Sequence, residues 1–207
     1  MGKKLLLCCL IGLSGFSYAQ VKRTANWYFG KNAGLKFTDT GVQVLKDGLV
    51  DTWEGCSSMS DSSGNLMLYS DGLTVWNRFH TIIKNGTGLR GDISSTQSAL
   101  ILPLPESDSI FVVITTPYAY DFYLGMRYSY VNIHGNKDSG ELYKKNTLLH
   151  FSSAEKVTAV RHQNGRDIWV VGHEFGNNRF YAYLLTKDGF NPCPVLSDQG
   201  VVFDRNA

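Results

Sequence analysis

Residues Cys56–Asn77 read CSSMSDSSGNLMLYSDGLTVWN, and the predicted architecture follows from this segment. A run of small residues, Cys56–Ser60, leads into a turn of Asp, Ser and Gly. An apolar run, Leu66–Ser70, and an aromatic run, Thr74–Asn77, come next. Short runs of this kind, bounded by turn residues, are typical of β-strands. The segment therefore predicts three consecutive strands of one antiparallel sheet.

The same unit recurs twice further along the chain. Its second copy contains Ser98–Leu102, a turn through Pro105–Asp108, Ser109–Thr115 and Arg127–Asn132. Its third copy contains Val157–Arg161, a turn at residues 162–165, Asp167–His173 and Arg179–Thr186. Met67, Ile110 and Ile168 occupy matching positions, so the period is roughly 40 to 60 residues. Repeats on this scale are typical of propeller blades.

We predict an all-β, β-propeller-like fold with about four antiparallel blades. Three N-terminal strands, at Trp27–Phe29, Gly34–Phe37 and Val42–Leu45, supply the fourth blade. Residues 20–207 are expected to form a single domain. Because Val201–Ala207 resembles the interior of a strand, we expect an incomplete part of a larger propeller, truncated at the C-terminus. A truncated gene product and a closed four-blade ring are the alternatives.

The first 19 residues resemble a signal peptide. Lys3 and Lys4 precede the apolar run Leu5–Leu13, and Ser17-Tyr18-Ala19 supplies the small residues of a cleavage site. The apolar run is too short to span a bilayer. We therefore expect export through the inner membrane to the periplasm, cell surface or extracellular space, with no membrane span after cleavage. A retained anchor is the alternative.

Charge and motifs argue against several function classes. Loss of Lys3 and Lys4 brings the 20 basic residues level with the 18 acidic ones, which argues against a nucleic-acid-binding protein. The five histidines form no His-x-His or His-Glu-x-x-His pattern, so no metal site is predicted. No Gly-x-Ser-x-Gly elbow or phosphate-binding glycine loop occurs, so we predict no cofactor and assign no catalytic residue.

Two cysteines, Cys56 and Cys193, would remain after cleavage. In an oxidising compartment they could form one disulfide. The alternative is two separate thiols, because the sequence does not establish that the two residues are close enough to bond.

Several motifs together resemble one family. They include Asn26-Trp27-Tyr28-Phe29-Gly30, Glu54-Gly55-Cys56-Ser57-Ser58-Met59-Ser60-Asp61, Tyr69-Ser70-Asp71-Gly72, Val75-Trp76-Asn77-Arg78 and Ser95-Thr96-Gln97-Ser98-Ala99. The chain resembles the N-terminal β-propeller region of exported Bacteroidetes proteins. These often carry a type B C-terminal sorting domain for type IX secretion and are named as gliding-motility-associated or surface proteins. The resemblance implies a propeller at the cell surface, and it supplies no defined activity.

Polar residues precede or open each small-residue strand, and they are our candidate binding residues. They are Glu54, Thr96, Gln97, Glu155 and Lys156. Equivalent blades would bring them together at one rim of the central channel, where several blades can share a ligand. Alternatively, these residues bond to neighbouring blade backbones and hold the sheets together. The aromatic segment Tyr118–Tyr123 is expected in a loop, either exposed for glycan or protein contact or packed on a blade edge.

The sequence thus favours a non-enzymatic, exported propeller module that mediates protein or glycan contacts at the bacterial cell surface. A carbohydrate-active lyase or glycosidase is the alternative, and it requires paired carboxylates, for which Glu54 and Glu155 are the candidates. A nonfunctional fragment of a larger surface protein is the third hypothesis.

Overall fold

The computed structural model describes residues 22–203, so the predicted signal peptide and the end of the predicted strand Val201–Ala207 lie outside the described part. Within that range the prediction of an all-β chain is confirmed. The helical elements described are one short 3-10 turn, η1 (Ala119–Leu124), and one short helix, α1 (Gly135–Asp138). Among residues 22–203 no helix is long and apolar enough to cross a membrane.

The first sheet is an antiparallel meander of three strands. These are β1 (Asn26–Phe29), β2 (Ala33–Thr38) and β3 (Gly41–Leu45). Along β1 the burial alternates, with Asn26 and Tyr28 buried and Trp27 and Phe29 exposed. Successive strand residues point to opposite faces. One face of the first sheet therefore packs inward, and the other remains uncovered.

Two four-stranded units follow. The second unit contains β4 (Ser57–Ser60), β5 (Leu66–Ser70), β6 (Thr74–Asn77) and β7 (Ile82–Thr87). The third unit contains β8 (Ala99–Pro103), β9 (Ile110–Thr115), β10 (Met126–Asn132) and β11 (Glu141–His150). Strands within each unit are antiparallel, and one parallel pairing of Lys84 with Glu141 joins β7 to β11. The two units thus form a single eight-stranded sheet.

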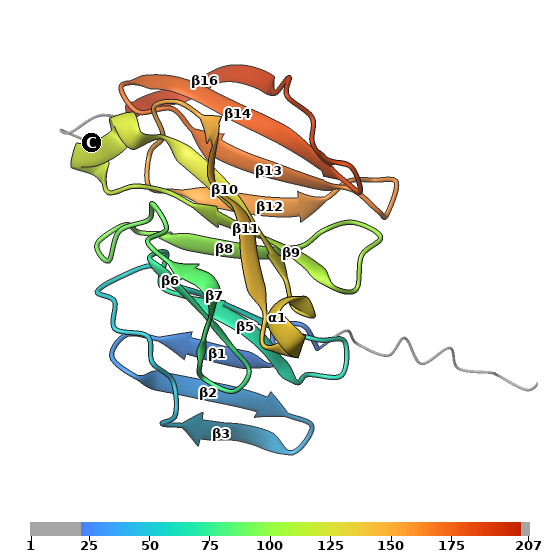
Figure 1. Ribbon diagram of the computed structural model, residues 1–207. Coiled ribbons are helices and arrows are strands. Elements are labelled where there is room, and N and C mark those ends of the chain that lie inside the picture. Colours follow the sequence, from blue (N-terminus) through green and yellow to red (C-terminus); the bar gives the residue numbers. More distant parts are fainter. Residues whose placement is uncertain (1–21, 204–207) are drawn as a thin grey trace, which may run out of the picture.

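The last sheet contains β12 (Val157–Arg161), β13 (Ile168–His173), β14 (Asn177–Thr186), β15 (Gly189–Phe190) and β16 (Val195–Phe203). Both β15 and β16 pair with β14 in the antiparallel sense. Figure 1 shows the strand groups layered in chain order, from the first sheet to the last sheet at the opposite end.

An apolar core lies between each pair of neighbouring layers. Tyr28 and Val50 pack against Tyr69 and Trp76, between the first sheet and the second unit. A larger cluster joins the second and third units, and a third cluster joins β9 and β10 to the buried face of the last sheet. Because a single sheet cannot bury both faces, this stacking of layers provides the core.

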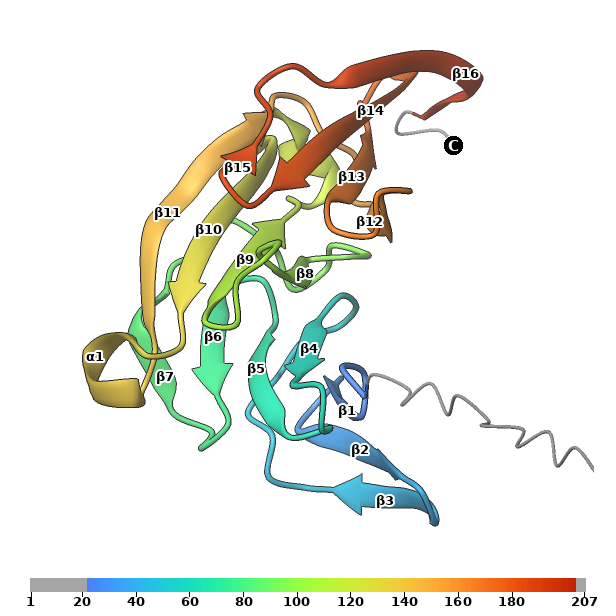
Figure 2. The ribbon, with the colours of Figure 1, turned by 90° about the vertical axis from the view of Figure 1, so that its right-hand side faces the viewer.

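Serines of β4 bond to the strands on either side of it. The Ser58 hydroxyl accepts a hydrogen bond from the backbone N–H of Tyr28 in β1, at 2.9 Å. The Ser57 hydroxyl accepts one from the N–H of Ile101 in β8, at 3.0 Å. Small side chains at these positions let the layers approach closely and satisfy backbone groups at their edges. Figure 2 shows the strand groups spreading outward from β1, β4, β8 and β12, with one side of the arrangement open.

The structure corrects the sequence-based prediction in three places. The expected separate blades are not all separate, because β7 and β11 meet at their edges, where Lys84 also forms an ion pair with Glu141 at 2.8 Å. The sequence Asn85-Gly86-Thr87-Gly88 is of turn type, but all of it except Gly88 lies within β7, because the positive φ of Asn85 is accommodated in a bulged strand. Strand β11 was not predicted, and β16 begins at Val195, earlier than expected.

Candidate functional site

The loop that carries Glu54 is held against the segment before β8. The backbone N–H groups of Trp53 and Glu54 both donate to the carbonyl of Ile93, and the Gly55 N–H donates to Ser95. The approach at Gly55 is close, because a Cβ there would lie 2.2 Å from the Ser98 nitrogen. This contact requires glycine and fixes the second unit against the third at the end where the candidate residues lie.

Glu155 is the centre of a hydrogen-bond network. Its Oε2 accepts from the backbone N–H of Thr96 at 2.9 Å and from the Thr96 hydroxyl at 2.8 Å. Its Oε1 accepts from the N–H of Ala119 at 2.7 Å. The residue is 9% exposed, so the network largely excludes solvent. Charge-assisted hydrogen bonds of this kind are the stronger ones in proteins.

Gln97 continues the same network. Its side-chain oxygen accepts from the N–H of Val157 at 2.8 Å, and its own N–H donates to the carbonyl of Glu155. The structure therefore brings Thr96, Gln97 and Glu155 together, where they join the third unit to the last sheet. Their side chains bond to neighbouring backbone groups, as in the alternative considered for them.

The other two candidates lie beside this network. Glu54 is exposed in the 51–55 loop. Lys156 is also exposed, with its Nζ 5.8 Å from the centre of the Phe203 ring. The carboxylates proposed for an enzyme thus differ in environment, because Glu155 already accepts three hydrogen bonds and Glu54 faces solvent.

Two strongly exposed aromatic side chains belong to segments that are bonded to this network or to the segment before β8. Trp53 is 78% exposed and Tyr120 is 56% exposed, and the Tyr118 and Tyr120 rings lie 5.1 Å apart. Loss of hydration, followed by the effects of Tyr120, Glu155, Asp92 and Glu54, raises the pKa of Tyr118. These carboxylates therefore lie near enough to act on the Tyr118 hydroxyl. We call Trp53, Glu54, Asp92, Tyr118 and Tyr120 the aromatic rim.

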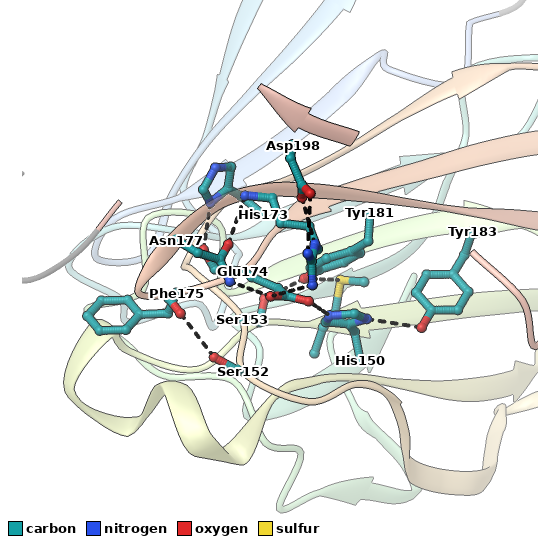
Figure 3. Close-up of polar contacts among 12 residues, drawn as sticks. His150, Ser152, Ser153, His173, Glu174, Phe175, Asn177, Tyr181, Tyr183 and Asp198 are labelled. Atoms are coloured by element: carbon teal, nitrogen blue, oxygen red, sulfur yellow. Dashed lines mark hydrogen bonds and ion pairs between the residues drawn. The ribbon is translucent and has the colours of Figure 1, made fainter. Parts of the chain in front are cut away.

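A second polar cluster links β11 to the last sheet (Figure 3). His150 Nε2 lies 2.9 Å from Glu174 Oε1, and its Nδ1 lies 3.0 Å from the Tyr183 hydroxyl. Its ring stacks on that of Tyr181, with centroids 3.7 Å apart. This arrangement fits the tautomer in which Nε2 donates to Glu174 and Nδ1 accepts from Tyr183.

The electrostatics of this cluster favour a structural role. Desolvation alone would raise the pKa of Glu174, but hydrogen bonds from Asn177 and His150, with the charge of Arg179, lower it. Burial, followed by the negative charge of Glu174, raises the pKa of Tyr183. The Tyr183 hydroxyl therefore stays protonated at neutral pH, and it can donate to His150 Nδ1 when that nitrogen carries no proton. Sequence reasoning missed this cluster. No local signal reveals it, because the partners of His150 are distant in the chain.

A similar chain joins the first sheet to the second unit. The Tyr28 hydroxyl donates to Asp47 Oδ1 at 2.9 Å, and Asp47 Oδ2 lies 3.4 Å from His80 Nε2. His80 Nδ1 in turn lies 3.1 Å from the Tyr69 hydroxyl. Burial, offset in part by a backbone hydrogen bond, raises the pKa of Tyr69 to about 12. The carboxylate–histidine–tyrosine arrangement thus occurs at two junctions between layers.

Cys56 and Cys193 are both free thiols in this structure, so the possible disulfide between them is not formed. Cys56 packs beside the core of Tyr28 and Tyr69, whereas Cys193 is exposed in the loop before β16. Burial, followed by the charge of Asp71, raises the pKa of Cys56 to about 11. In the described part of the chain, His, Cys, Asp and Glu form no group of three or more that could hold a metal ion.

No family model, curated protein or solved structure matches this chain.

Proposed function

We propose that the four strand groups are blades of a β-propeller, and that the chain is an exported, non-enzymatic module for protein or glycan contacts at the bacterial cell surface. The layers are antiparallel, spread from β1, β4, β8 and β12, and bury apolar cores between neighbours. Propellers bury both faces of each sheet in this way and leave only short protected edges.

The observation that carries the contact function is the exposure of the aromatic rim above a rigid base. The Glu155 network fixes the segments beneath it, while Trp53 and Tyr120 remain more than half exposed. Exposed tryptophan and tyrosine supply large contact area with a small loss of conformational entropy on binding. Carboxylates at Glu54 and Asp92 can accept hydrogen bonds from hydroxyl or amide groups of a ligand.

The proposal that the protein is exported rests on the sequence of residues 1–19 and on the resemblance to exported proteins described above. The near balance of basic and acidic residues fits a contact surface whose binding does not depend on a strong electrostatic field of the whole protein. We therefore place the functional protein in the periplasm, at the cell surface or outside the cell, with a protein or a glycan as its partner.

A cell-surface binding assay tests this function. The labelled protein should bind outer-membrane fractions of the producing bacterium, and Trp53→Ala and Tyr120→Ala should each reduce binding at least tenfold. Phe79→Ala is the matched control, because Phe79 is 62% exposed but lies outside the aromatic rim. Loss of binding after protease treatment would identify a protein partner, and loss after periodate oxidation would identify a glycan. Binding that is absent, or unchanged in both rim variants, would overturn the proposal.

A further inference from the structure

The two end layers each have an uncovered apolar face. In the first sheet the pairings Trp27–Leu35, Leu35–Val44 and Phe37–Val42 place these residues on one face. The Trp27 and Phe37 rings contact each other, with centroids 4.9 Å apart. Tyr28, which pairs with Gly34, points the opposite way, into the core. The uncovered face is thus formed by Trp27, Phe29, Leu35, Phe37, Val42 and Val44, which we call the first face.

The last sheet has a matching face with a groove. Val160 pairs with Trp169, His173 pairs with Phe180, and Val171 pairs with Ala182, all on the side opposite the buried Val170 and Tyr181. A groove of about 400 Å³ runs over this side. Its lining is mostly apolar and includes Val171, Phe180, Val201 and Phe203. Together with Val160 and Trp169, these residues form what we call the last face.

Inside the chain, faces of this composition are covered by a neighbouring layer. The opposite face of the first sheet is covered at the junction where Tyr28 stacks on Tyr69, with ring centroids 4.7 Å apart. The first and last faces lie at opposite ends of the stack and border its open side (Figure 2). Contact between the two faces would therefore continue the stacking that the three inner junctions already show.

We propose that two copies of this chain associate head to tail, so that the first face of each packs on the last face of the other. This inference rests on the propeller arrangement proposed above. The first face offers projecting aromatic rings and the last face offers a groove to receive them. A head-to-tail contact is heterologous, and two such contacts close into a ring when the second copy fills the open side. Two copies would supply about eight blades, within the usual range for propellers.

The exposed area fits such a contact. The first face has three partly exposed aromatic side chains, Trp27, Phe29 and Phe37, which are 38–49% exposed. Each can therefore still bury about a third to a half of the roughly 150–250 Å² that a whole aromatic side chain buries. In the proposed ring each copy buries its first face in one contact and its last face in the other. The two contacts together, with the aliphatic side chains included, approach the roughly 800 Å² per partner of a standard interface. Exposed apolar patches of this size mark interaction sites in soluble proteins.

Sedimentation velocity and light scattering of the leader-free protein test the proposal. The wild-type protein should be a dimer at micromolar concentration. Trp27→Glu, on the first face, and Phe180→Glu, on the last face, should each be monomeric with an unchanged circular dichroism spectrum. Trp53→Glu is the control, because Trp53 is more exposed than either residue but lies on the aromatic rim.

Mixing the two monomeric variants gives the decisive result. The Phe180→Glu copy keeps an intact first face and the Trp27→Glu copy keeps an intact last face, so their mixture should form a heterodimer through one junction. A monomeric wild type, a dimer that survives either face variant, or a mixture that stays monomeric would overturn the proposal. Assembly into larger oligomers would overturn the two-copy ring. Monomeric protein with intact binding at the aromatic rim would leave the proposed contact function standing.

Discussion

Thr96 and Glu155 are bonded twice, because the backbone N–H and the hydroxyl of Thr96 both donate to the same carboxylate oxygen, at 2.9 and 2.8 Å. The two residues precede β8 and β12, so this pair joins the third unit to the last sheet at their inner edges. The other carboxylate oxygen binds the loop that carries Tyr118 and Tyr120. The base of the aromatic rim and the junction between layers therefore depend on one side chain.

Replacing that side chain should destabilise the fold. Glu155→Ala removes three hydrogen bonds and leaves the N–H groups of Thr96 and Ala119 without this acceptor, which should cost about 2–3 kcal/mol. Glu155→Gln keeps one acceptor oxygen, while its amide nitrogen cannot accept a hydrogen bond, so it should cost less than Glu155→Ala. Urea denaturation followed by circular dichroism measures the loss. Glu54→Ala is the control and should stay within about 0.5 kcal/mol of wild type. Equal stabilities of Glu155→Ala and Glu54→Ala would contradict this prediction.

The strands that the sequence predicted well are those with strong apolar character between turn residues. Leu66–Ser70, Thr74–Asn77 and Val157–Arg161 begin and end where predicted. The poorly predicted strands are outer ones. In β11, Lys144 and Asn146 have positive φ values and most residues are at least partly exposed, so neither alternation nor an apolar run marks the strand. Strand β16 is exposed along almost its whole length.

The candidate site was predictable in position but not in bonding. Thr96, Gln97 and Glu155 occupy equivalent places in the repeat, and the structure brings them together. Their hydrogen bonds to backbone groups depend on the exact approach of the layers, which the sequence does not contain. The contact of His150 with Glu174 follows from topology alone, because β11 and the end of β13 meet only in the folded chain.

Gly55 should tolerate no side chain. A Cβ at this position would lie 2.2 Å from the Ser98 nitrogen and 2.6 Å from the Ser95 carbonyl oxygen, and neither backbone atom can move without breaking the junction. We expect Gly55→Ala to destabilise the protein by about 2 kcal/mol or more through this overlap. Differential scanning calorimetry should show a lower Tm. Ser63→Ala, in the exposed turn before β5, should leave the Tm nearly unchanged. A Gly55→Ala protein with the wild-type Tm would show that the loop can shift.

Acid should weaken the His150 cluster through Glu174. Hydrogen bonds and Arg179 lower the pKa of this carboxyl in the folded protein, below its value of about 4.3 in an unfolded chain. A lowered folded-state pKa gives stability that is present above the unfolded pKa and is lost as the pH falls through the folded one. The free energy of unfolding of wild type should therefore fall more steeply below about pH 4.3 than that of Glu174→Gln. Glu106→Gln, at an exposed site, is the control and should follow the wild-type curve of unfolding free energy against pH. A Glu174→Gln curve that runs parallel to the wild-type curve would exclude this linkage.

The two thiols should differ in reactivity. Cys193 is exposed, whereas Cys56 is partly buried and has its pKa raised to about 11, so only a very small fraction of Cys56 is thiolate at neutral pH. Because the thiolate is the reactive form, iodoacetamide should label Cys193 within minutes and Cys56 at least tenfold more slowly. Peptide mass spectrometry after timed quenching resolves the two sites, and denatured protein, in which both should label rapidly, is the control. Resistance of both cysteines to labelling until a reductant is added would instead reveal a disulfide and contradict the separation of Cys56 from Cys193 in the fold.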